Sequence, residues 1–133
     1  MITHIGLENF KGFKKTGFLP LKKLTFLVGK NSSGKSSLLK ALAVFSQTSN
    51  TRFKKTHSLS RVLDTNGKFV DIGIYDEIVN DGKKDFELSF VLENNGPSVH
   101  EVDDKWLSYS FGRGKSKIDT ILKSIKIGNL KDW

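Results

Sequence analysis

The sequence predicts an α/β fold in which a P-loop unit is joined to an antiparallel β-subdomain. Residues 29 to 36, GKNSSGKS, match the Walker A pattern G-x-x-x-x-G-K-[ST], which requires a strand before it and a helix after it. The second half of the chain alternates apolar and polar residues between turn signals, as half-buried antiparallel strands do. Together these observations predict a strand, P-loop and helix followed by meandering hairpins.

Both structural contexts that the P-loop needs are predicted around it. Residues 24 to 28, LTFLV, form a short apolar run without a polar face, which is typical of a strand buried on both sides. Residues 35 to 46 are predicted to form an amphipathic helix. Its apolar stripe has helical spacing and consists of Leu38, Leu39, Ala41, Leu42 and Phe45. The polar residues 47 to 50, QTSN, are expected to end this helix.

The remaining elements are predicted from alternation and turn signals. An N-terminal strand is expected at residues 2 to 10, with Ile5 and Leu7 on one face, and a turn region at residues 12 to 17. Residues 47 to 58 are polar and basic and are expected to be a mobile loop. Further strands are predicted at residues 68 to 75, 86 to 93 and 105 to 111. The tail has both helical and alternating spacing, and we favour a strand near residues 121 to 127.

The P-loop pattern predicts a nucleoside triphosphate site, because a tight loop turns successive backbone N-H groups onto the phosphates. Gly29 and Gly34 permit that backbone, Lys35 is expected to reach the β and γ phosphates, and Ser36 to offer its hydroxyl to Mg²⁺. Lys35 is the one catalytic residue predicted, and Ser36 the one metal ligand. The other predicted nucleotide contacts in the loop are Asn31, Ser32, Ser33 and Ser37.

Composition limits the class of protein and its partners. The chain has 133 residues, a net charge of +8, a pI of about 9.7 and no cysteine, so disulfides and thiolate metal sites are excluded. The positive charge favours polyanions such as nucleic acid, and a solvated basic surface explains it equally well. No apolar run approaches the roughly 20 residues that span a bilayer, and no secretory signal begins the chain. A cytoplasmic protein without a membrane partner is therefore expected.

Two segments resemble a known protein family when they are taken together. Residues 5 to 13, IGLENFKGF, followed by residues 24 to 39, LTFLVGKNSSGKSSLL, resemble ABC-class AAA ATPases. The nearest are the SMC-like and OLD-nuclease-like heads of bacterial DNA repair and of Septu-type anti-phage systems. The likeness covers residues 1 to about 45 closely and residues 69 to 79 more loosely.

The resemblance implies that residues 1 to 133 form the N-terminal lobe of an ATPase head. Residues 1 to 46 would carry the strand, P-loop and helix, and residues 59 to 127 the antiparallel β-subdomain. It also implies that Asn9, Phe10 and Lys11 approach the nucleotide. Two heads would sandwich ATP and Mg²⁺, a C-terminal lobe absent from this sequence would supply the hydrolytic acids, and DNA or a nuclease subunit would be engaged.

The sequence departs from this family at several positions and leaves alternatives open. It has no L-S-G-G-like signature, no clear switch His and no Q-loop glutamine. Residues 72 to 77, IGIYDE, end in Asp76 and Glu77 as a Walker B strand does, although Gly73 argues against a central strand there. A Ras-like GTPase is disfavoured because no N-K-x-D motif occurs. The alternative function is a non-catalytic basic adaptor that binds nucleic acid or a partner ATPase.

Overall fold

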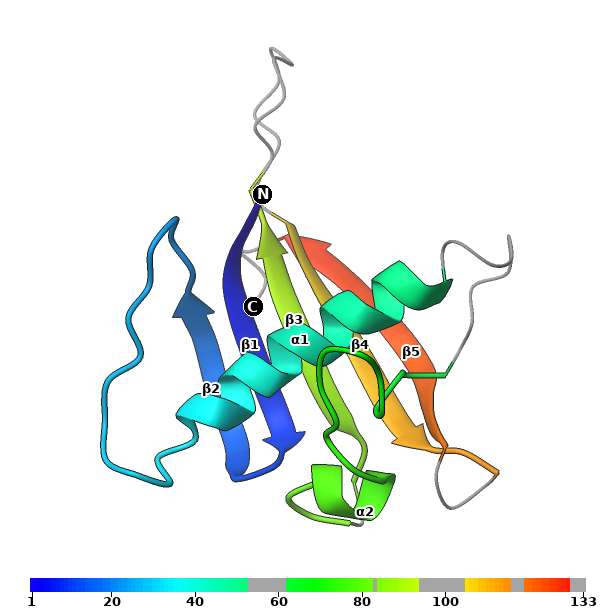
Figure 1. Cartoon of the computed structure of the whole chain (residues 1–133). Coiled ribbons are helices and arrows are strands. Elements are labelled where there is room, and N and C mark those ends of the chain that lie inside the picture. The colour runs from blue at the N-terminus through cyan, green and yellow to red at the C-terminus, as the bar shows by residue number, and fades with distance from the viewer. Residues whose placement is uncertain (53–61, 83, 94–104, 116–118, 130–133) are drawn as a thin grey trace.

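The computed structural model describes residues 1–52, 62–82, 84–93, 105–115 and 119–129, with residues 49–52 described by their backbone. Five antiparallel strands form one sheet in the order β2-β1-β3-β4-β5, and helix α1 crosses one face of it from β2 toward β5 (Figure 1). The elements are β1 (Ile2–Phe10), β2 (Phe13–Pro20), α1 (Lys35–Arg52), α2 (Tyr75–Ile78), β3 (Phe86–Leu92), β4 (Lys105–Arg113) and β5 (Thr120–Asn129).

The hydrophobic core lies between α1 and the sheet. Leu38, Ala41 and Val44 of α1 are buried, and the Phe45 ring lies 4.5 Å from the Phe90 ring between centroids. The predicted amphipathic helix is thus confirmed, but its apolar stripe is narrower than expected, because Leu39 is 57% exposed. Neither helix in the described part of the chain combines the length and apolar character needed to cross a membrane.

The opposite face of the sheet, called the polar face below, carries an internal hydrogen-bond network beside the apolar Val91 and Trp106. Ser89 Oγ and Ser108 Oγ lie 2.9 Å apart across β3 and β4, and Ser108 Oγ donates to Glu87 Oε2 at 3.0 Å. Glu87 in turn pairs with Lys126 of β5 at 2.9 Å. From Phe86 to Phe90, alternation in β3 therefore separates apolar side chains under α1 from polar ones on the other face, as expected of an antiparallel sheet with one side packed.

Alternation predicted most of the strands correctly. Strands β1, β3, β4 and β5 cover the expected segments, and β3, β4 and β5 form the predicted meander. The turn region expected at residues 12 to 17 is wrong, because only Lys11 and Gly12 separate β1 from β2. The bulge lies in β2, where Thr16 and Gly17 stand opposite Leu7 of β1. It accommodates the polar Thr16, whose Oγ1 accepts from the Leu7 N-H at 2.9 Å.

Residues 24 to 28 do not form the predicted buried strand. The segment has no strand assignment, and the side chains of Leu24, Phe26 and Val28 are 72%, 79% and 88% exposed. It belongs to the stretch that leaves the sheet beyond the edge strand β2 and returns to α1 (Figure 1). The prediction fails because no strand among the described residues pairs with this segment, so its apolar side chains stay uncovered.

Helix α1 continues past its predicted end, through residues 47 to 52, so the expected loop at 47 to 58 is wrong for its first half. Residues 53 to 58 lie outside the described part. Gln47 is 1% exposed, and its amide bonds to four backbone groups of the chain that follows: Asp64 O, Phe69 N, Val70 N and Val70 O. Thr48 Oγ1 donates to Val44 O at 2.8 Å, which helices tolerate. Both polar residues serve the helix instead of ending it.

The strand predicted at residues 68 to 75 is also wrong. That segment forms a single bridge between Asn66 and Asp71, and the short helix α2 then begins at Tyr75. Gly73 has φ +86°, a left-handed conformation that interrupts an extended chain. Strands β1 and β2 share one sheet with β3 to β5. The division into parts 1–46 and 59–127 stays a prediction.

Replacing Gln47 by leucine should destabilise the protein. Leucine fills a similar volume but satisfies none of the four backbone groups that the amide binds, so we expect the free energy of unfolding to fall by about 2 to 4 kcal/mol. Urea unfolding followed by circular dichroism measures this. Leu39→Gln, on the exposed side of the same helix, is the control and should change stability by less than about 0.5 kcal/mol. Equal effects of the two substitutions would contradict the role of Gln47.

Candidate phosphate-binding site

The P-loop leads directly into α1, whose first residue is Lys35. The Lys35 ammonium donates to the carbonyls of Gly29 and Lys30 at 2.7 and 2.6 Å, and to Ser33 Oγ at 3.3 Å. The Leu38 N-H donates to Gly34 O at 3.0 Å, which joins the end of the loop to the first helical turn. The loop therefore closes around the lysine that is expected to meet the phosphates.

The loop and helix start together form an exposed, electropositive end. Asn31, Ser32, Ser33 and Ser36 are exposed, and Ser37 is half-buried. No acidic residue occupies the first turn of α1, so nothing there neutralises the positive end of the helix dipole. The structure thus brings together all the P-loop residues that the sequence predicted. Anion binding is the chemistry this end of a helix favours.

The structure shows the three residues that the resemblance places near the nucleotide in contacts within the fold. They are Asn9, Phe10 and Lys11. The Phe10 side chain is fully buried in the core. The Asn9 amide donates to the carbonyls of Asp81 and Lys84 at 3.0 and 2.7 Å, and its oxygen accepts from the Asp81 N-H. The structure gives these residues structural contacts, and their predicted approach to the nucleotide stays a prediction.

Lys11 fastens the β1–β2 turn to the segment before β3. Its ammonium donates to Ile72 O at 2.6 Å and to Glu77 O at 2.9 Å, and its own carbonyl accepts from Asn80 Nδ2 at 2.8 Å. Partial burial, and then the charge of Lys40 on α1, hold the pKa of Lys11 below its ordinary value. Lys11 therefore joins the β1–β2 turn to the α2 region through hydrogen bonds.

Asp76 and Glu77 do not form a Walker B arrangement. The Arg113 guanidinium donates to both carboxylate oxygens of Asp76, and Glu77 Oε2 accepts from the Ile74 N-H at 3.2 Å, capping α2. Both acids are thus engaged within the fold. In the part of the chain that the structure describes, no group of three His, Cys, Asp or Glu side chains could hold a metal ion.

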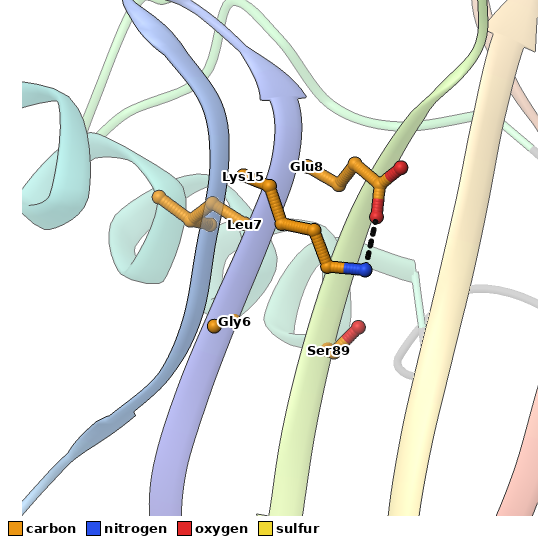
Figure 2. Close-up of a pocket in the computed structure, with 6 residues that line it drawn as sticks. Gly6, Leu7, Glu8, Lys15 and Ser89 are labelled. Atoms are coloured by element: carbon orange, nitrogen blue, oxygen red, sulfur yellow. Dashed lines mark ion pairs between the residues drawn. The ribbon is translucent and has the colours of Figure 1, made fainter. Parts of the chain in front are cut away.

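A shallow hollow on the polar face of the sheet is too small for a nucleotide. It is lined by Gly6, Glu8, Lys15 and Ser89 among others, and Lys15 pairs with Glu8 at 3.3 Å across it (Figure 2). Its volume of about 10 Å³ holds roughly one water molecule. This hollow is therefore not a candidate nucleotide site.

Sequence reasoning missed one residue beside the loop, Phe13 at the start of β2. Gly34 has φ +91°, and a Cβ atom added there would overlap the Phe13 ring. The ring packs where a side chain at position 34 would stand. The sequence carried no signal for this contact, because 21 positions separate the two residues and no local period links them.

The comparison with protein families finds a match over most of the sequence. A family model described as AAA ATPase domain matches residues 1–132, which is nearly the whole chain. No curated protein matches the sequence. The matched range includes the P-loop, α1 and all five strands.

Replacing Lys11 by methionine should loosen the α2 region. Methionine keeps an apolar stem of similar length but leaves the carbonyls of Ile72 and Glu77 without their donor, which should cost about 1 to 2 kcal/mol. Amide hydrogen exchange should accelerate at residues 72 to 79, and Lys14→Met, which alters an exposed lysine of β2, should leave it unchanged. If the Lys11 variant keeps wild-type protection at these residues, the two hydrogen bonds of the Lys11 ammonium do not stabilise the α2 region.

Proposed function

The chain belongs to the AAA ATPase domain family, and from that premise we propose that it binds Mg-ATP through the loop that leads into α1. The observation that carries this proposal is the position of Lys35. Its ammonium lies within 2.7 Å of two loop carbonyls, at the start of an 18-residue helix with no acid in its first turn. Such an end of a helix favours a polyphosphate over a neutral ligand.

Each part of the loop has a separate task in this proposal. Lys35 neutralises the β and γ phosphates, and the backbone N-H groups from Asn31 to Ser36 donate to the phosphate oxygens. Exposed at the first turn of α1, the Ser36 hydroxyl fits Mg²⁺, which prefers oxygen ligands. The bound Mg²⁺ would offset the charge of the phosphates. Catalysis by this loop is electrostatic stabilisation and positioning.

Hydrolysis is proposed to need a second lobe. Asp76 and Glu77, the acids that best resemble a Walker B pair, are bound to Arg113 and to the backbone of α2. In addition, the exposed apolar segment at 24 to 28 and the exposed Leu39 are surfaces that soluble domains normally cover. A further lobe of the ATPase, packed beside the P-loop, would cover both and bring the missing acids.

The partners of the complete protein form the finer part of the proposal. The resemblance of residues 1 to 45 to SMC-like and OLD-nuclease-like heads supports a second head, and DNA or a nuclease subunit in bacterial defence or repair. Exposed lysines around the P-loop and β2 support contact with a polyanion. These are Lys14, Lys22, Lys23, Lys30 and Lys40.

Replacing Lys35 by alanine should weaken Mg-ATP binding roughly 10- to 100-fold, because one charge-assisted contact to the phosphates is lost. Isothermal titration calorimetry of the purified chain measures this affinity. Lys40→Ala removes the same charge from an exposed position of the same helix and should bind as the wild type does. An unchanged affinity in Lys35→Ala would overturn the assignment of the P-loop.

The chain by itself should bind ATP without hydrolysing it. Its steady-state Mg-ATP turnover should equal that of Lys35→Ala, which corrects for contaminating ATPases. Turnover that disappears in Lys35→Ala would show that the chain completes its own acid site, and Asp76 and Glu77 would then be the residues to replace.

A further inference from the structure

The ring of Phe13 occupies the space that the missing side chain of Gly34 leaves. Three carbon atoms of the ring, including its tip Cζ, are the nearest neighbours that a Cβ atom on Gly34 would meet. Gly34 directly precedes Lys35, the predicted catalytic residue and the first residue of α1. The Gly34 carbonyl accepts a hydrogen bond from the Leu38 N-H in the first turn of the helix. By restricting the position of the Gly34 backbone, the Phe13 ring therefore also restricts the position of the loop end and of the first turn of α1.

Phe13 is itself held at a rigid point of the fold. It follows the two-residue turn after β1, in which Lys11 has φ +51°, and the Lys11 N-H donates to Ile78 O at 2.5 Å. Phe10 forms a bridge with Val79, and the Asn9 carbonyl accepts from the Asn80 N-H at 3.1 Å. The turn is thus bound on one side to the α2 region and on the other, through Phe13, to the P-loop.

We propose that Phe13 is a positioning residue for the P-loop, acting through Gly34 on the geometry in which the loop receives phosphates. This inference rests on the proposed function of the loop. A loop of small polar residues has many conformations when it is exposed, and binding costs the free energy of selecting one. The ring, seated against Gly34 and anchored by the turn, removes part of that cost before the nucleotide arrives.

A plain core role is the competing explanation, because Phe13 also packs against the hydrophobic core. Leu19 distinguishes the two roles. It lies on the same strand, packs against the same core and pairs with Ile5 of β1. Leu19→Ala should therefore lower stability as Phe13→Ala does, without moving the P-loop.

The first arm of the experiment measures Mg-ATP affinity by calorimetry for the wild-type chain, Phe13→Ala, Phe13→Leu and Leu19→Ala. We expect affinity to fall roughly tenfold in Phe13→Ala. It should recover largely in Phe13→Leu, which restores apolar bulk beside Gly34, and remain unchanged in Leu19→Ala. If the wild type and Phe13→Ala bind Mg-ATP equally well, the inference about Phe13 is overturned, but the proposed function of the P-loop is not. A wild type that binds no Mg-ATP overturns the proposed function, and with it the role of Phe13 in it.

The second arm tests the contact without nucleotide. Gly34→Ala is disfavoured by the positive φ and by the overlap with the ring, whereas in a Phe13→Ala background only the positive φ remains. The melting temperature should therefore drop less when Gly34→Ala is added to Phe13→Ala than when it is made alone. Equal drops would show that the ring does not bear on Gly34, and would overturn the inference whatever the affinities.

Discussion

The packing of α1 across one face of the sheet is the constraint on which the rest of the structure depends. It buries Leu38, Ala41 and Val44 against strands that come from both halves of the sequence. Because Lys35 is the first residue of that helix, the same packing decides where the P-loop stands relative to the sheet. The packing that stabilises the fold thus also positions the candidate site. Toward the other end of the helix, Gln47 adds hydrogen bonds to the backbone of Asp64 and Val70.

How much of this could be predicted depends on whether the cause is local. Strands β1, β3 and β4 each have one face under α1, so buried apolar residues recur at every second position of their sequences. The P-loop was recognisable because phosphate binding needs particular residues at fixed spacing. The strand predicted at residues 24 to 28 is wrong. An apolar run indicates that its side chains favour burial, but it does not tell whether this chain supplies the residues that would bury them. The bonds of Gln47 and the contact of Phe13 with Gly34 join distant positions, and no local pattern reveals them.

The turn between β1 and β2 shows how tertiary contacts stabilise an unfavourable backbone. Asn9 and Lys11 both have positive φ, which costs a residue with a side chain roughly 1 to 2 kcal/mol, although asparagine tolerates it better. The bonds of Asn9 to the loop before β3, and those of Lys11 to Ile72 and Glu77, offset that cost. The side chains of Asn9 and Lys11, within the segment NFKGF, therefore have a structural role in holding this turn.

The polar face of the sheet has a consequence for how copies of the chain meet in solution. Two bare apolar sheets would stack face to face, as the layers of a sandwich or a fibril do. Here the side chains of Ser89, Ser108 and Glu87 bond to one another, and Lys126 closes the row. An approaching sheet would have to dehydrate the charged side chains of Glu87 and Lys126. Among the described residues, this row of polar side chains thus opposes the stacking of one sheet on another.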